Sequence, residues 1–204
     1  MGMRATTGAI AQVFRVDGKM RCRILGNVPP RGICGSGLVD AVAAGLESGI
    51  VSEDGRIMSE AGTYPLCDPV VLLQRDIREL QVAKAAIAAG FRILVRNCGV
   101  SIKDVSKVYL AGAFGNYIDR TNAHRIGLLP LPPERVQPVG NSALLGAKLS
   151  LFRSDGTLFD QVLSHSRHVE LNLDEEFQEV FVGEMGFMPD AGQQAEGEHR
   201  EVEQ

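Results

Sequence analysis

Three glycine-rich segments of the 204-residue sequence contain backbone that could bind an anionic ligand. Glycine lets a ligand approach the main chain closely, and unpaired N–H groups at the start of a helix attract anions. The same glycines satisfy the steric needs of any strand-to-helix turn, so each segment taken singly is explained by structure alone. The segments are Gly35-Ser36-Gly37, Gly112-Ala113-Phe114-Gly115-Asn116 and Gly140-Asn141-Ser142.

Common phosphate-binding motifs do not match these segments. The sequence contains no Walker loop and no complete Gly-x-Gly-x-x-Gly with an acidic residue downstream. The pair Gly35-x-Gly37 lacks a third glycine and an obvious preceding strand. A Rossmann dinucleotide site is therefore not predicted.

The other reactive side chains do not form a recognisable catalytic set. Cys34 lies beside a predicted helix start, which could activate its thiol, although a buried structural thiol explains it more simply. Ser36 is expected to cap the same helix. The candidate acids are Asp40, Asp76, Asp104 and Asp119, and three of them stand where helix starts or turns favour aspartate anyway.

Metal ligands are also not predicted from spacing. The histidines are His124, His165, His168 and His199, and none of them forms a plausible ligand pair. The four cysteines, Cys22, Cys34, Cys67 and Cys98, are widely separated and include no Cys-x-x-Cys. Reduced, mostly buried thiols are expected, and neither zinc nor an iron–sulfur cluster is expected within this chain.

Composition narrows the class of protein. Hydrophobic residues make up 45% and charged residues 23%, as in an α/β globular domain, and the net charge is −4. That charge argues against nucleic acid as a partner. No apolar run reaches the roughly 20 residues that span a bilayer, and the N-terminus has no apolar signal segment, so neither a membrane association nor secretion is expected. The predicted location is cytoplasmic.

Hydrophobic periodicity predicts alternating strands and helices. Residues 75–97 form the longest helical pattern, with an apolar stripe and Lys84 at its margin. The stripe consists of Ile77, Leu80, Ala83, Ile87, Phe91, Leu94 and Val95. Strands are predicted at 9–16, 20–25, around 69–72, at 107–111 (buried), 136–139 and 168–173, and further helices at 38–48, within 117–127, at 142–152 and within 174–188.

Six motifs in a fixed order resemble one family, the C-terminal domain of the reductive activators of corrinoid proteins. The resemblance covers about residues 2 to 173. The motifs are GMRAxxGAI at 2–10, GICGSGLVD at 32–40, DIRELQxAKAAI at 76–87, VYLAGAFGNY at 108–117, IGLLP at 126–130 and VGNxALxGA at 139–147.

The resemblance implies a fold and a function. The fold would be α/β, the C-terminal lobe of an actin-like ATPase (ribonuclease H-like), with a mixed sheet flanked by helices, as in sugar kinases and heat-shock chaperones. Such activators use ATP and Mg²⁺ together with a [2Fe-2S] cluster, which lies in a separate N-terminal domain. They reduce inactive cobalt(II) corrinoid proteins to the cobalt(I) state used in methyl transfer. A corrinoid protein is therefore the expected partner, and a homodimer is possible.

The resemblance also implies where a nucleotide would lie. The turn Gly112-Ala113-Phe114-Gly115-Asn116 corresponds to the adenosine-side turn of that superfold. Gly140 and Asn141 open the later connecting helix between the lobes. The helix predicted over residues 75–97 would lie beside the nucleotide, which makes Arg78, Glu79 and Lys84 candidate neighbours.

The sequence departs from the family in one respect. The two phosphate loops of the superfold normally precede the region where this chain begins, and no Asp-x-Gly-Thr is present. We therefore expect an N-terminally truncated domain at 1–173, a C-terminal helix at 174–188 and a disordered polar tail at 189–204. No catalytic residue and no metal ligand is assigned, and the chain alone is expected neither to hydrolyse ATP nor to carry electrons.

Two alternatives of other classes remain open. The first is a non-catalytic module that docks a corrinoid protein or dimerises, in which the glycine turns are purely structural. The second is a sugar-kinase-like enzyme, against which the missing phosphate loops argue, because a kinase needs them for the γ-phosphate.

Overall fold

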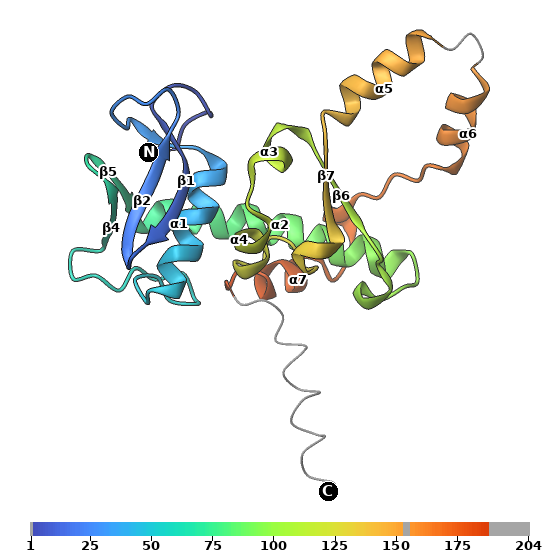
Figure 1. Ribbon diagram of the computed structural model, residues 1–204. Helices are drawn as coiled ribbons and strands as arrows, with labels where there is room; N and C mark the ends of the chain where they lie inside the picture. The colour runs from blue at the N-terminus through green and yellow to red at the C-terminus, as the bar shows by residue number, and fades with distance from the viewer. Residues whose placement is uncertain (1, 153–155, 188–204) are drawn as a thin grey trace, which may run out of the picture.

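A computed structural model describes residues 2–152 and 156–187 (Figure 1). The chain opens with the predicted hairpin: β1 (Ala9–Val16) pairs antiparallel with β2 (Lys19–Ile24) through Asp17 and Gly18, both at positive φ. β3 (Gly32–Ile33) joins β1 in parallel, which gives the order β2-β1-β3. The sheet is mixed, as predicted.

Two further pairs of strands complete the β structure. The region around 69–72, for which one strand is predicted, holds a hairpin of β4 (Thr63–Cys67) and β5 (Val70–Leu73). β6 (Val108–Ala111) pairs in parallel with β7 (Val136–Gly140). The prediction of a buried strand here is wrong, because Tyr109 of β6 is 63% exposed and only alternate residues are partly covered.

Helices connect and cover these strands. α1 (Gly35–Glu47) packs on β1, and the long α2 (Gln74–Asn97) runs behind both halves of the molecule (Figure 1). α5 (Ser142–Leu151) and α6 (Thr157–His165) project away from the body in the same view. The other helices are α3 (Gly112–Tyr117), α4 (Arg120–Arg125) and α7 (Phe177–Gly183), with 3₁₀ turns at Ile102–Asp104, Pro133–Arg135 and Leu171–Leu173.

The buried face of α2 differs from the predicted stripe. Ile87 is 52% exposed and Leu94 44% exposed, whereas Lys84, placed at the margin by the pattern, is completely buried. The helix lies between the loop before β4 and the C-terminal segment, and the polar Gln81 and Lys84 face these neighbours. The apolar stripe of α2 is wider than the surface that its neighbours cover. The packing partners, rather than the stripe, therefore decide which side chains of α2 are buried.

The C-terminal region departs from its prediction too. Residues 168–173 form no strand and end in a 3₁₀ turn. The helix expected within 174–188 begins at Phe177, and the preceding Asp174 and Glu176 form ion pairs with Arg96 of α2. The polar tail predicted at 189–204 lies outside the described residues.

The contact between α1 and β1 depends on one glycine. A Cβ added to Gly37 would lie 2.4 Å from the carbonyl oxygen of Ile10, which is backbone and cannot rotate away. We expect Gly37→Ala to lower the free energy of unfolding by about 2 kcal/mol. Gly146 of α5 has no atom within 4 Å of such a Cβ, so Gly146→Ala should raise it by about 0.5–1 kcal/mol. Urea denaturation of both variants measures the difference, and equal effects would contradict the packing argument.

Candidate nucleotide-binding site

The parallel pairing of β6 and β7 brings two of the glycine-rich segments together. Ala111, the last residue of β6, pairs with Gly140, the last residue of β7. Both strands run in the same direction, so the turns that follow them leave from one edge of the pair, where ligands of α/β folds commonly bind. Gly112 has φ +90° and Gly140 has φ +68°, a conformation that favours glycine at both exits.

The segment after β6 is itself helical. α3 begins at Gly112, directly after the strand, and Gly115 lies so close to β6 that a Cβ would be 2.7 Å from Cγ of Leu110. A Cβ on Gly140 would be 3.8 Å from Nδ2 of Asn116, so the two turns touch. A Cβ on Gly112 would meet nothing within 4 Å, which leaves open space on that side of the backbone.

Phe114 connects this edge with the start of α1. A Cβ on Gly35 would be 3.0 Å from Cε2 of Phe114, although 46% of the phenylalanine side chain remains exposed. A hollow of about 200 Å³ lies next to this contact and is lined by Cys34, Ser36 and Tyr117 among others. The segment Gly35-Ser36-Gly37 therefore lies beside α3, a proximity that its position in the sequence did not predict.

Ser36 does not cap α1. The helix begins after Cys34, and Ser36 lies in its first turn, where its hydroxyl donates to the carbonyl of Ala11 at 2.9 Å. Cys34 is buried, with its sulfur 3.3 Å from the Ser36 hydroxyl. Asn141, by contrast, caps α5 by accepting from the N–H of Leu144 at 3.0 Å.

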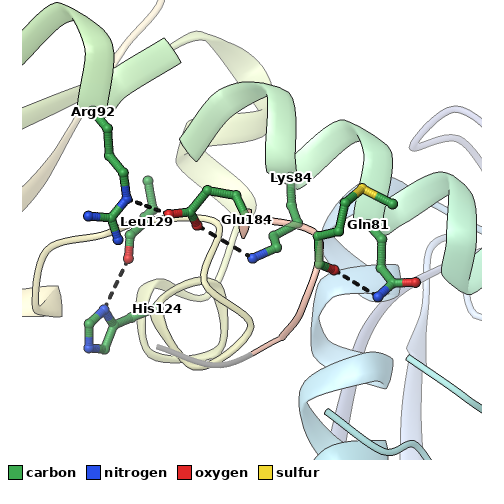
Figure 2. A network of polar contacts seen from close by, with 7 residues as sticks. Gln81, Lys84, Arg92, His124, Leu129 and Glu184 are labelled. Carbon is green, nitrogen blue, oxygen red and sulfur yellow. Dashed lines mark hydrogen bonds and ion pairs between the residues drawn. The ribbon is translucent and has the colours of Figure 1, made fainter. Parts of the chain in front are cut away.

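The candidate residues on α2 make their contacts elsewhere. Arg78 donates to the carbonyl of Asp54 at 2.7 Å and to Oε1 of Gln81 at 2.6 Å, and Glu79 is exposed. Lys84 is buried, with Nζ 3.8 Å from a carboxylate oxygen of Glu184 (Figure 2). In the described part of the chain, Arg78 and Lys84 therefore bind the loop before β4 and the C-terminal segment.

Three of the four candidate aspartates have local structural roles. Asp76 accepts from the N–H of Leu73 at 2.8 Å, Asp104 from Ser101 at 2.9 Å, and Asp119 from Asn122 at 2.8 Å. These contacts cap the starts of α2, a 3₁₀ turn and α4. They agree with the prediction that three of the four aspartates stand at helix starts or turns.

Asp40 differs from the other three because it is buried between elements. One oxygen accepts from Nδ2 of Asn122 at 2.8 Å and the other from the N–H of Val13 at 3.3 Å. Burial raises the pKa of Asp40 to about 6, although these two hydrogen bonds lower it, and the nearby Asp119 adds to the increase. No sequence pattern distinguished this aspartate, since its partners lie on β1 and α4.

Asp40 makes the stability of the protein dependent on pH. Its folded pKa lies above its unfolded value of 3.8, so its stabilising effect is complete below that value and is lost as pH rises through 6. Between pH 5 and 8 we expect wild type to lose about 1–2 kcal/mol of unfolding free energy relative to Asp40→Asn. Urea denaturation at four pH values measures this, and parallel pH curves for the two proteins would exclude the effect.

The described residues do not fit a metal centre or an iron–sulfur cluster. Within residues 2–152 and 156–187, no three His, Cys, Asp or Glu side chains are close enough to hold one ion. A [2Fe-2S] cluster needs four cysteine ligands, and Cys34 and Cys98 lie on different elements. No described helix is long and apolar enough to cross a membrane.

Comparison with known proteins defines the class. A family model, described as the C-terminal domain of RACo, the ASKHA domain, matches residues 1–197. The chain belongs to this family, the actin-like ATPase domain of RACo-type corrinoid activators. The fold class and the family expected from the sequence motifs are thereby confirmed.

Particular relatives agree with this assignment. The corrinoid activation enzyme RamQ of Eubacterium limosum is 34% identical over 89% of this chain, and the [Co(II) methylated amine-specific corrinoid protein] reductase of Methanosarcina barkeri is 26% identical over 76%. The solved structure of a reductive activator for corrinoid, iron-sulfur protein superposes with a TM-score of 0.79 at 30% identity over 94% of the chain. The chain spans 35%, 29% and 34% of the lengths of these three proteins.

Proposed function

We propose that this domain binds the adenosine side of ATP at the edge formed by β6 and β7. The observation that carries the proposal is the pairing of Ala111 with Gly140, which places two glycine exits next to each other. Gly112 borders open space, and the exposed ring of Phe114 offers a face on which a base can stack. Membership of the ASKHA family supports adenine nucleotide as the ligand.

The position of α1 supports a direction for the bound nucleotide. Its first turn lies against Phe114, and unpaired N–H groups at a helix start attract phosphate oxygens. We therefore place the adenosine near Gly112–Asn116 and the phosphates toward Gly35 and Ser36. Arg78, Glu79 and Lys84 stay candidate neighbours, and Arg78 and Lys84 would reach the nucleotide only if their present contacts were released.

The domain would serve a larger protein that reactivates cobalt(II) corrinoid proteins for methyl transfer. The names of the relatives RamQ and the methylated-amine-specific reductase support this activity. The Mg²⁺-binding phosphate loops and the [2Fe-2S] cluster of such a protein would come from outside these residues. ATP hydrolysis and electron transfer are therefore not expected from the 204-residue chain alone.

Isothermal titration tests the nucleotide site directly. Titrating the purified chain with ATP, ADP and adenosine should show weak, saturable binding, with GTP binding more weakly because its base differs. No binding of any adenine ligand at millimolar concentration would overturn the proposal. A measurable ATPase rate would overturn the expectation that the chain alone is inactive.

A docking or dimerisation role is the second candidate, and one observation favours it. Large apolar side chains on α5 and α6, and directly after α5, are exposed, among them Leu149 at 56%, Phe152 at 87% and Leu163 at 71%. Apolar surface of this extent usually contacts another surface. Light scattering after size-exclusion chromatography, across a range of concentrations, distinguishes a dimer from a monomer.

A further inference from the structure

Two cysteines that are distant in the sequence lie at one junction between sheets. Cys22 belongs to β2, an edge strand of the three-stranded sheet, and Cys67 is the last residue of β4. β2 and β4 pack against each other, as Figure 1 shows at the left of the molecule. Both side chains are partly buried against the same apolar core.

The alternation of β2 points Cys22 toward this junction. Met20, Cys22 and Ile24 are half-buried, whereas the residues between them are exposed. Since side chains of a strand alternate between faces, Cys22 shares the face of Met20. Met20 accepts a hydrogen bond through its sulfur from the hydroxyl of Tyr64 on β4, at 3.8 Å.

A bulge in β4 points Cys67 the same way. The pairing with β5 steps from Pro65–Val71 to Cys67–Val70, so Leu66 is an extra residue. An extra residue reverses the alternation, which returns Cys67 to the side of Tyr64. The contact between Tyr64 and Met20 therefore joins the two faces that carry the thiols.

The electrostatics of the junction agree with this geometry. Burial, together with the Cys67 thiol that shares a hydrogen bond with it, raises the pKa of Cys22 to about 12. Burial and the nearby Cys22 likewise raise the pKa of Tyr64. The other two thiols have separate environments: Cys34 contacts Ser36, and Cys98 is exposed at the end of α2.

We propose that Cys22 and Cys67 are a redox modification site that forms a reversible disulfide with a low-molecular-weight disulfide as oxidant. The Cys67 thiolate attacks the oxidant and releases one thiol. Cys22, whose raised pKa disfavours its thiolate, then attacks the mixed disulfide from within the same protein and releases the other thiol. Two protein thiols and one small disulfide become one protein disulfide and two small thiols. Both cysteines are only partly buried, which leaves a small oxidant such as glutathione disulfide access.

Oxidation would tie the β4–β5 hairpin to the three-stranded sheet. The bond joins residues that are far apart in the chain, so it restricts the unfolded state strongly. We expect the midpoint of thermal unfolding to rise by about 5–10 °C, and this rise to disappear on reduction. The pair lies away from the β6–β7 edge, so the inference does not depend on the proposed nucleotide site.

Mass spectrometry of the whole 204-residue chain tests the inference. Incubation with oxidised glutathione should lower the mass of the protein by about 2 Da, the mass of the two thiol hydrogens. Denaturing alkylation should then modify only the two cysteines that remain free. Trypsin should then release peptide 57–75 linked to the dipeptide Cys22-Arg23. Absence of this linked peptide under excess oxidant, or a linkage to Cys34 or Cys98, would overturn the proposal.

Variants provide the matched controls. Cys22→Ser and Cys67→Ser should each abolish both the mass loss and the rise in the unfolding midpoint. Cys98→Ser should keep both, because this exposed thiol lies on another element. The linked peptide is sought in the wild-type chain, so the result stands even if a serine variant folds poorly. An equal rise in the midpoint for Cys22→Ser would contradict the pairing.

Discussion

Gly112→Asp is expected to weaken adenine nucleotide binding at least about tenfold, which is about 1.4 kcal/mol. The new side chain would enter the open space beside the backbone at the β6–β7 edge, where a ligand must approach. Its negative charge would repel a nucleotide, and the positive φ of residue 112 adds strain of about 1–3 kcal/mol for a side chain. Isothermal titration of ATP into both proteins measures the loss.

Two control variants separate charge from strain. Gly112→Ala imposes a strained side chain without charge, so its binding should lie between those of wild type and Gly112→Asp. Gly62→Asp introduces the same charge at another glycine of positive φ with open surroundings, and it should bind ATP as wild type does. If Gly112→Asp and Gly62→Asp bound equally well, the β6–β7 edge would not be the nucleotide site.

Glu184→Gln is expected to lower the free energy of unfolding by about 3 kcal/mol, the largest stability effect that the structure predicts. Glu184 forms ion pairs with both Lys84 and Arg92 of α2 (Figure 2). Lys84 is completely buried, and in the described residues its Nζ has no hydrogen-bond partner, so Glu184 balances its charge. Burial already lowers the pKa of Lys84, while Glu184 opposes that change.

Urea denaturation of a double variant tests this account. Lys84→Met with Glu184→Gln removes the buried charge as well as its partner, and it should return to within about 1 kcal/mol of wild type. Glu47→Gln removes the exposed pair with Arg125 and should cost less than about 0.5 kcal/mol. A loss for Glu184→Gln no larger than that for Glu47→Gln would show that the buried pair does not stabilise the protein.

Part of the candidate nucleotide site could be predicted from the sequence. Gly112 to Asn116 and Gly140 to Asn141 follow strands with clear apolar patterns, and parallel strands place their exits at one edge. No sequence pattern predicted the contact of Phe114 with Gly35, because this contact depends on how α1 approaches α3. The expected roles of Arg78, Glu79 and Lys84 came from family resemblance, and they remain predictions.

Long-range packing accounts for the errors in the fold prediction. The periodicity of residues 75–97 correctly predicts a helix, but several apolar faces are possible, and contacts with Glu184 and Met185 decide which face is buried. Ser36 is a good capping residue, yet the carbonyl of Ala11 takes its hydroxyl. In both cases a contact with a residue distant in the sequence outweighed the local structural preference.

The amino-acid sequence by itself determined the local secondary structure. Backbone preferences and apolar periods act within a few residues, so the sequence specifies most of the strands and helices and the capping aspartates, and its ordered motifs identify the ASKHA family. Tertiary structure alone decided which charges are buried, why the pKa of Asp40 is raised to about 6, and that Cys22 meets Cys67. These features depend on desolvation and on contacts between distant elements, neither of which is encoded in the spacing of neighbouring residues.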